Sequence, residues 1–346
     1  RSSTLLHRRP VGHRHGVSTD EVCCVWQCRG VRWGTIEYAR IGEHHVAFRE
    51  VVGDERSALD IVMVNGFFFP MESLTDDPIA ARLVQGLAEL GRLVMFDRRG
   101  IALSDPVTDW ETPLLEQWSE DLAAVIRAAE CDHPSVFSWE AAGVARTCAI
   151  RHPGLIDRLI LYNPSSEPTE SDAAWIERVE EMLSRVRAGE VDLTADGSAW
   201  APSRRNDPDF IRWNDAAGRS GASPAQAGRL SKVFNEPRPD NALVGARTLV
   251  LTRTHEESMV PAEHSQRAAV QIPDAELVVL PAGDDSLFGY GIDDVVAEIS
   301  RFLTGHARLP APVRQIAAIL FTDLVGSTRR AAAAGDAAWK QLLDRH

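Results

Sequence analysis

The chain has 346 residues, of which 44% are hydrophobic and 25% are charged; this length and composition are typical of a globular protein with room for two domains. No apolar run approaches the roughly 18 residues needed to cross a bilayer, so no transmembrane segment is expected. The formal net charge of −13 argues against a nucleic-acid partner, because proteins that bind the phosphate backbone carry a basic face.

The five cysteines do not form the framework of a secreted scaffold, and a reducing cytoplasm is the expected location. Cys131 and Cys148 fall in predicted regular elements and are expected to be buried apolar fillers. The other three lie between residues 23 and 28, downstream of two histidines. A zinc site there is the alternative to an ordinary tail, although the spacing fits no common ligand pattern.

Residues 1–34 show little periodicity and lack the continuous apolar stretch of a signal peptide, so we expect them to be poorly ordered. From residue 35 onward, strand-sized apolar runs alternate with apolar residues at helical spacing. Strands are predicted at Thr35–Arg40, His45–Val52, Ile61–Val64, Leu93–Phe96, Ser135–Ser138 and Leu159–Tyr162, and helices at Ile79–Leu90, Leu115–Ala129 and Ala141–Arg151. This alternation predicts an α/β fold with a mostly parallel sheet and helices on both faces.

The alternation then stops, because residues 165–242 are mostly helical and read as an inserted cap. It resumes with strands at Thr248–Leu251 and Leu277–Leu280 and helices at Pro261–Val270 and Ile292–Leu303. Residues 306–315 contain two prolines and no apolar periodicity, which indicates a linker. We therefore expect one domain over residues 35–305 and the start of another over residues 316–346.

Five short motifs follow predicted strands of the first domain. They are Asn65-Gly66, Asp97–Gly100, Phe137–Gly143, Val260-Pro261 and Leu280–Ser286. In this combination, the segment from Ile61 to Leu303 resembles the α/β-hydrolase family. The resemblance covers about three quarters of the chain and implies an α/β-hydrolase fold with a helical cap.

The family's nucleophile lies in a Gly-x-Ser-x-Gly elbow, where small residues permit a strained turn. Aligned on that motif, Ser138 replaces the first glycine, Glu140 the serine and Ala142 the last glycine. The resemblance also places Glu257 at the family's acid and Ser286 at its histidine. Because serine chemistry needs a hydroxyl and an imidazole together, we expect the triad positions Glu140, Glu257 and Ser286 to be inactive.

A pocket is nevertheless expected beside the elbow. Asn65 and the amides of Phe67 and Ala141 stand where the family forms its oxyanion hole, and such amides bind a carbonyl or an oxyanion. Phe67–Phe69 and the cap tryptophans either line an apolar cavity or belong to the plain core. Arg98–Arg99 are expected to brace the loop beneath the elbow. The expected ligand is a small apolar or carbonyl compound, and no cofactor is expected for this domain.

Glu140 itself allows three interpretations. It is a relic position with a satisfied carboxylate, or an acid that contacts a ligand or senses pH, or a covalent nucleophile like the elbow carboxylate of family members that act on alkyl halides and epoxides. In the last case the extra methylene displaces the attacking oxygen by about 1 Å, which alone can cost ~100-fold. A base is also needed, and His255 is the nearest candidate in the sequence.

Within residues 316–346, a predicted apolar strand ends at Asp323. The chain then turns through Val325–Thr328 into a predicted helix, whose free amides can face phosphates. With Gly335-Asp336 and Trp339, this segment resembles the start of a class III adenylate/guanylate cyclase catalytic domain. The resemblance implies that Asp323 is a metal ligand, with Mg or Mn required only by a complete domain. An ordinary strand-end acid is the alternative.

Taken together, the two resemblances predict a regulatory or ligand-sensing pseudo-hydrolase module of an adenylate cyclase in cyclic-nucleotide signalling. A homodimer through the cyclase part is expected, because two cyclase domains pair to form a site in that family. The chain as given is expected to be inactive. A longer protein in which the cyclase domain continues past His346 would be an adenylate cyclase. The alternatives are an active hydrolase that uses Glu140 on esters, epoxides or haloalkanes, and a decayed product without a ligand.

Overall fold

The computed structural model describes residues 31–53, 58–66, 68–188, 201–254, 260–284 and 286–308, with positions 333, 335 and 339 in addition. The chain divides into two compact units, Arg1–Pro310 and Ala311–His346, and the fold described below is that of the first unit. The predicted cyclase segment, residues 316–346, lies outside the described residues apart from those three positions. None of the described helices is long and apolar enough to cross a membrane.

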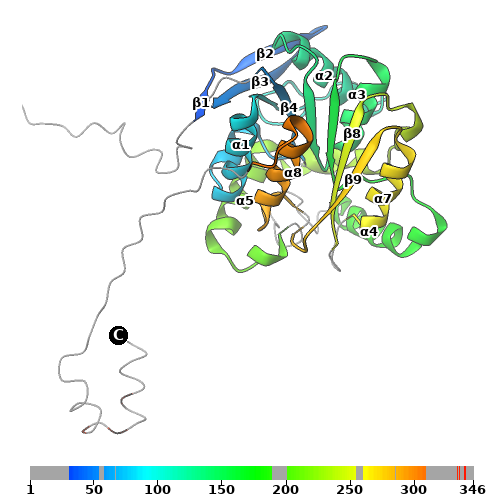
Figure 1. Cartoon of the computed structure of the whole chain (residues 1–346). Helices are drawn as coiled ribbons and strands as arrows, with labels where there is room; N and C mark the ends of the chain where they lie inside the picture. The colour runs from blue at the N-terminus through cyan, green and yellow to red at the C-terminus, as the bar shows by residue number, and fades with distance from the viewer. Residues whose placement is uncertain are drawn as a thin grey trace, which may run out of the picture. The chain divides into compact units, whose positions relative to one another are not determined.

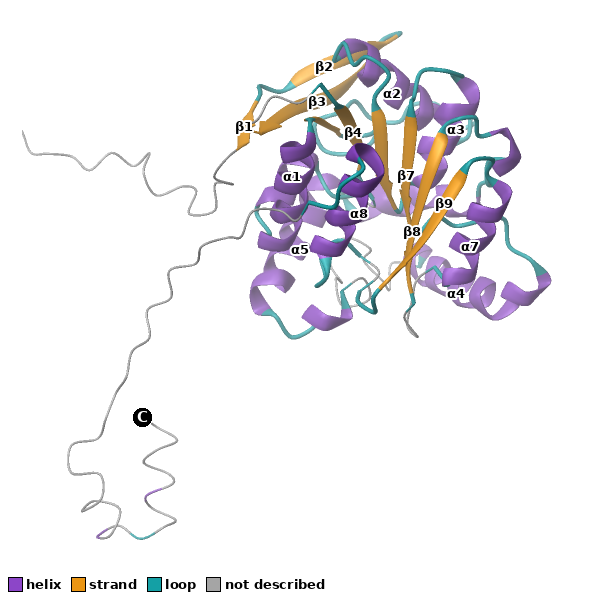
Figure 2. Cartoon of the chain, in the orientation of Figure 1, coloured by secondary structure: helices purple, strands orange, loops and turns teal. Residues whose placement is uncertain are grey.

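A mostly parallel sheet runs through the first unit (Figures 1 and 2). Its order is β1-β3-β5-β4-β6-β7-β8-β9, with β2 paired to β3 as well. The strands from β5 to β9 are parallel, whereas β3 runs antiparallel to β1, β2 and β5. The described strands are β1 (Val31–Trp33), β2 (Glu37–Ile41), β3 (His44–Gly53), β4 (Asp60–Val64), β5 (Arg92–Phe96), β6 (Ser135–Trp139), β7 (Arg158–Tyr162), β8 (Arg247–Arg253) and β9 (Ala275–Leu280).

Helices cover both faces of this sheet. One face carries α1 (Pro78–Leu90) and α8 (Ile292–Thr304), which lie side by side in Figure 1. The other face carries α2 (Leu114–Ala128), α3 (Ala142–Arg151) and α7 (Ala262–Gln271). The predicted α/β fold with a mostly parallel sheet and helices on both faces is therefore confirmed.

The central strands are apolar throughout because both of their faces are buried. Along β4, Val62 and Val64 enter the core beneath α2 and α3, whereas Ile61 and Met63 enter the core beneath α1 and α8. All four side chains are fully buried. Each such burial stabilises the fold by about 1.5–3 kcal/mol, and together they fix the carboxyl ends of β4 and β6 side by side.

The segment between β7 and β8 is helical. Proline follows an N-cap residue at the start of two of its helices: Asp207 caps α5, and Ser223 caps α6, an arrangement that satisfies free amides at the first turn. The described elements of this segment are α4 (Ala173–Arg187), α5 (Pro208–Gly221), α6 (Pro224–Leu230) and the 3₁₀ turns η3 (Glu170–Asp172), η4 (Pro202–Arg204), η5 (Ser231–Asn235) and η6 (Asn241–Leu243). A further 3₁₀ turn, η2 (Met71–Thr75), precedes α1.

Strand β1 differs from expectation, since the sequence assigned residues 1–34 to a poorly ordered segment. Val31–Trp33 instead pairs with the end of β3, and the Arg49 guanidinium lies 4.9 Å from the centre of the Trp33 ring. A strand of three residues is too short to show hydrophobic periodicity, so it could not be predicted from the sequence. It forms because it pairs with β3. Residues 1–30 lie outside the described residues.

Candidate functional site

A sharp turn joins β6 to α3. Strand β6 ends at Trp139, α3 begins at Ala142, and Glu140 between them has a φ of +57°. A left-handed backbone costs a residue other than glycine roughly 1–2 kcal/mol, and such positions cluster at functional sites. The amide of Ala141 donates a hydrogen bond of 2.6 Å to the carbonyl oxygen of Trp139 across the turn. The strained residue of the elbow is therefore a glutamate.

The loop after β4 approaches this turn closely. The parallel register pairs Val64 with Ser138, so the residues that follow both strands meet above the sheet. A β-carbon at Gly66 would lie 2.8 Å from Oε2 of Glu140 and 3.0 Å from the Trp139 carbonyl oxygen. The Glu140 carboxylate is the flexible end of a side chain and could move aside, but the Trp139 carbonyl oxygen would also have to shift by a few tenths of an ångström, so glycine fits this approach best.

A cavity of about 130 Å³ lies beside Glu140, comparable with the roughly 150 Å³ cavity that holds one benzene molecule in another protein. Among the described residues that line it, Glu140 is the sole carboxylate, and none is a histidine. Its walls are mostly apolar side chains of the cap and of α2. They are Leu115, Trp118, Trp175, Val179, Met182, Val233 and Phe234.

Two arginines also line the cavity, Arg98 and Arg238. Arg98 is buried, and its guanidinium lies 4.4 Å from the centre of the Trp118 ring. Burial lowers the pKa of Arg98 to about 10, and the charges of Asp121, Asp97 and Glu140 oppose that shift. The Arg98 guanidinium and the Glu140 carboxylate are thus electrostatic neighbours in a mostly apolar space.

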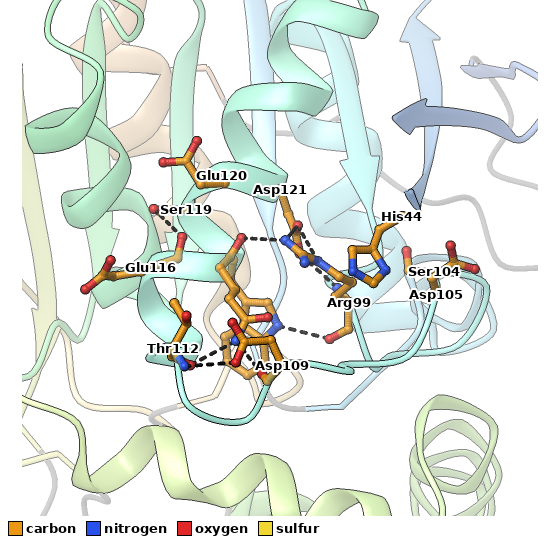
Figure 3. A network of polar contacts seen from close by, with 12 residues as sticks. His44, Arg99, Ser104, Asp105, Asp109, Thr112, Glu116, Ser119, Glu120 and Asp121 are labelled. Atoms are coloured by element: carbon orange, nitrogen blue, oxygen red, sulfur yellow. Dashed lines mark hydrogen bonds and ion pairs between the residues drawn. The ribbon is translucent and has the colours of Figure 1, made fainter. Parts of the chain in front are cut away.

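Arg99 fastens the loop after β5 to α2, as Figure 3 shows. Its Nε and Nη2 donate to Oδ1 of Asp121 at 2.8 and 2.5 Å, and its backbone amide donates to Oδ2 at 3.1 Å. Nε1 of Trp118 donates to the carbonyl oxygen of Arg99 at 3.0 Å. Since Trp118 is also a cavity wall, this ion pair positions one side of the site.

Arg146 of α3 is a buried cation that the sequence analysis missed. Its Nη1 donates to Oδ1 of Asn241 at 2.6 Å, its Nη2 to the Ser165 carbonyl at 2.8 Å, and its Nε to the Ala142 carbonyl at 3.2 Å. Burial lowers the pKa of Arg146 to about 9, and the charge of Arg238 acts in the same direction. The only signal in the sequence was a charged residue in the middle of a predicted helix, with apolar residues before it and two positions after it.

The structure brings two of the predicted site residues, Glu140 and Ala141, to the cavity. Ser286, at the family's histidine position, is buried, and its hydroxyl oxygen accepts a 3.1 Å bond from the Phe288 amide. Ser286 is not among the described lining residues. Asn65 is buried, and neither polar atom of its side chain has a hydrogen-bond partner among the described residues.

Four further predicted positions lie outside the described residues. They are Phe67, His255, Glu257 and Asp323. The roles assigned to them, an oxyanion-hole amide, a base, a triad acid and a cyclase metal ligand, stay predictions, as does the assignment of Glu140 and Ser286 to an inactive triad. The cluster of cysteines between residues 23 and 28 also lies outside the described part of the chain.

The strand order, the helices on both faces and the positive-φ elbow define an α/β-hydrolase fold, which solved structures match over about 79% of the chain. An esterase from Thermogutta terrifontis shares 19% identity with a TM-score of 0.62, covering 79% of this chain and 99% of its own. An enol-lactonase from Burkholderia xenovorans shares 18% with a TM-score of 0.61, covering 78% and 100%. A hydrolase from Pseudomonas aeruginosa shares 22% with a TM-score of 0.59, covering 78% and 99%.

These identities establish the fold and leave the activity open. No family model matches the sequence, and no curated protein matches it. The names of these three similar structures, an esterase, an enol-lactonase and a hydrolase, describe those proteins. The comparisons bring no support for a fused cyclase domain.

Proposed function

We propose that this domain binds a small, mostly apolar molecule in the cavity beside Glu140. The observation that carries the proposal is a cavity with mostly apolar and aromatic walls beside the strained elbow, where Glu140 is the one carboxylate among the described lining residues. Serine-type hydrolysis needs a hydroxyl at the elbow and an imidazole within hydrogen-bond reach. The elbow residue is a glutamate and no histidine is among the described lining residues, whereas a mostly apolar cavity of the kind that binds small molecules lies beside it.

Thermal-shift and NMR titrations with a panel of one-ring compounds test this proposal. A saturable rise in melting temperature is expected, because a ligand that binds only the folded state stabilises it by mass action. Val179→Trp fills the cavity from α4 and should abolish the shift. Val270→Trp is the matched control, because Val270 is 87% exposed and lies outside the described lining. An equal shift in both variants, or none with any compound, contradicts the proposal.

Hydrolysis through Glu140 is the second candidate, favoured by the strained elbow and by the names of the similar structures. An oxygen of Glu140 would attack the electrophilic carbon of an ester, epoxide or haloalkane. With a haloalkane the halide leaves, and with an epoxide the ring carbon–oxygen bond breaks and its oxygen takes a proton from water; both leave an alkyl ester on Glu140. With an ester the alkoxide leaves and takes a proton from water, and a mixed anhydride remains on Glu140. Water then hydrolyses the alkyl ester or the anhydride and frees the Glu140 carboxylate. The second step needs a base, and the described cavity offers neither a histidine nor a second carboxylate.

Activated esters, epoxides and haloalkanes separate the two candidates. Turnover that Glu140→Gln abolishes supports the hydrolase. A covalent adduct on Glu140, detected by mass spectrometry without turnover, shows attack without the second step. If neither turnover nor an adduct is detected and the ligand still binds, the binding function is supported and the hydrolase candidate is contradicted.

We also propose that a bound ligand regulates a nucleotide cyclase, which rests only on the sequence of residues 316–346. The test joins residues 1–346 to a complete cyclase catalytic domain and compares cyclic-AMP formation with and without a ligand of the cavity. Turnover of ATP by residues 1–346 alone contradicts the predicted inactivity of this chain. Cyclase activity that no cavity ligand alters contradicts the regulatory role.

A further inference from the structure

We infer that ligands enter the cavity through a groove beside α4, and that Glu236 holds the loop of residues 233–238, the gate loop, closed between the two spaces. This inference rests on the proposed binding function and adds the route of entry and the residue that controls it. It follows from how the parts of the helical segment between β7 and β8 are fastened to the rest of the domain.

The cavity shares a wall with a neighbouring groove of about 260 Å³. Four half-buried side chains line both spaces: Trp175 and Val179 of α4, and Phe234 and Arg238 of the gate loop. The groove also has exposed lining residues, which are Glu167, Glu180, Asn235 and Pro237. The wall between α4 and the gate loop is therefore a boundary between the cavity and the surface of the domain.

Glu236 fastens the gate loop to the start of α2. Its Oε1 accepts a 2.6 Å hydrogen bond from the amide of Leu114, and its Oε2 accepts a 2.8 Å bond from the amide of Leu115. Pro113, the residue before α2, makes no side-chain bond to these amides, so a residue more than a hundred positions away caps the helix. Since Leu115 lines the cavity, this contact draws the gate loop against the cavity wall.

The gate loop is bonded within itself and at its two ends. Lys232, just before the loop, donates from Nζ to the carbonyl oxygen of Trp110 at 2.7 Å, and the amide of Arg238 donates to the exposed Glu167 at 3.2 Å. The Arg238 guanidinium donates to three carbonyl oxygens of the loop, those of Phe234, Glu236 and Val233, at 3.0, 3.1 and 3.4 Å. The loop can therefore turn about its ends as one unit when Glu236 leaves α2.

Another part of the helical segment is fixed by buried contacts. Arg204 of η4 forms a 2.7 Å ion pair with Asp77, and the two side chains are 3% and 1% exposed. Nε1 of Trp213, in α5, donates to the carbonyl oxygen of Ser73 at 2.8 Å. Separating a buried ion pair is costly, whereas the Glu236 contact is only partly buried. Opening is therefore expected at the gate loop and not at η4 or α5.

Exchange of fluorobenzene, followed by ¹⁹F NMR, tests the inference. In Glu236→Ala we expect the association and dissociation rates to rise together by about 10-fold, the lower end of the effect of losing hydrogen bonds to a charged group. The Kd should change by less than about 2-fold, because the closed loop remains the main state and the cavity itself is unaltered. Glu236→Gln keeps a neutral acceptor and should give an intermediate rate, and it gives an answer even if Glu236→Ala fails to fold.

Glu116→Gln is the matched control for Glu236→Gln. It removes a carboxylate from the same first turn of α2, where Glu116 pairs with Arg151 at the surface, and it should leave both rates unchanged. Unchanged rates in the Glu236 variants, or weaker binding without faster association, overturn the gate while the binding function stands. If neither fluorobenzene nor any other one-ring compound binds, the binding function falls and the gate falls with it.

Discussion

Oε2 of Glu140 lies 2.8 Å from the point that a β-carbon at Gly66 would occupy. Gly66→Ala is therefore expected to push the Glu140 carboxylate aside and to crowd the Trp139 carbonyl oxygen, which should lower the free energy of unfolding by about 1 kcal/mol, the low end of the cost of overpacking. Urea denaturation measures this change. Since the Trp139 carbonyl is a second contact at 3.0 Å, Glu140→Ala in the same chain should recover only part of the loss. Additive losses in the double variant would contradict the contact.

Glu140→Gly should be more stable than Glu140→Ala by about 1 kcal/mol, because both variants remove the carboxylate beside Arg98 and only glycine relieves the positive φ. Glycine adopts the positive φ of the elbow without the roughly 1–2 kcal/mol penalty of other residues, and part of that gain is lost to the greater freedom of the unfolded chain. The comparison is Glu181→Gly, at an exposed position of α4, which should cost about 0.5–1 kcal/mol. If Glu140→Gly is no more stable to urea than Glu140→Ala, the elbow is not strained.

The ion pair of Arg99 with Asp121 should be far more sensitive than the ion pairs at the surface. The two side chains are 8% and 0% exposed, and removing one partner leaves a buried charge, which costs about 3–5 kcal/mol. Asp121→Ala is therefore expected to lower the urea midpoint strongly. Asp209→Ala breaks the exposed pair with Arg212 and should cost at most about 1 kcal/mol. Similar losses in the two variants would refute this account.

Asp97 should make stability depend on pH in the acid range. Burial raises the pKa of Asp97 from 3.8 to about 6, although it accepts bonds from the amides of Met71 and Leu103. The folded chain thus holds this proton more tightly than the unfolded chain. The stabilisation is complete below pH 3.8 and is lost as the pH rises through about 6.

Asp97→Asn isolates this contribution, because the amide does not titrate and its oxygen can still accept from Met71. The free energy of unfolding of the wild-type chain, minus that of the variant, should fall between pH 4 and pH 7. Urea denaturation at several pH values measures the difference. Parallel curves across this range would show that Asp97 does not carry the effect.

Hydrophobic periodicity in the sequence predicted the helices and strands of the sheet and its two helical layers. Most of the contacts around the cavity join residues far apart in the sequence and could not be predicted in this way. The expected helix Ile79–Leu90 is α1, Pro78–Leu90, because its apolar spacing and the cap at Asp77 are local features. The bonds of Arg146 to Asn241 and Ser165 span 95 and 19 residues, and no local pattern encodes them. The engagement of the Ala141 amide likewise depends on the path of the backbone at one residue.

The contacts of Arg146 have a mechanical consequence. The side chain ties the first residue of α3, Ala142, both to Ser165, before the helical segment, and to Asn241, at the end of it. One guanidinium group thus joins the N-terminus of α3 to residues at both ends of the helical segment. A displacement of the N-terminus of α3, at the cavity, would therefore be transmitted to Ser165 and Asn241 together.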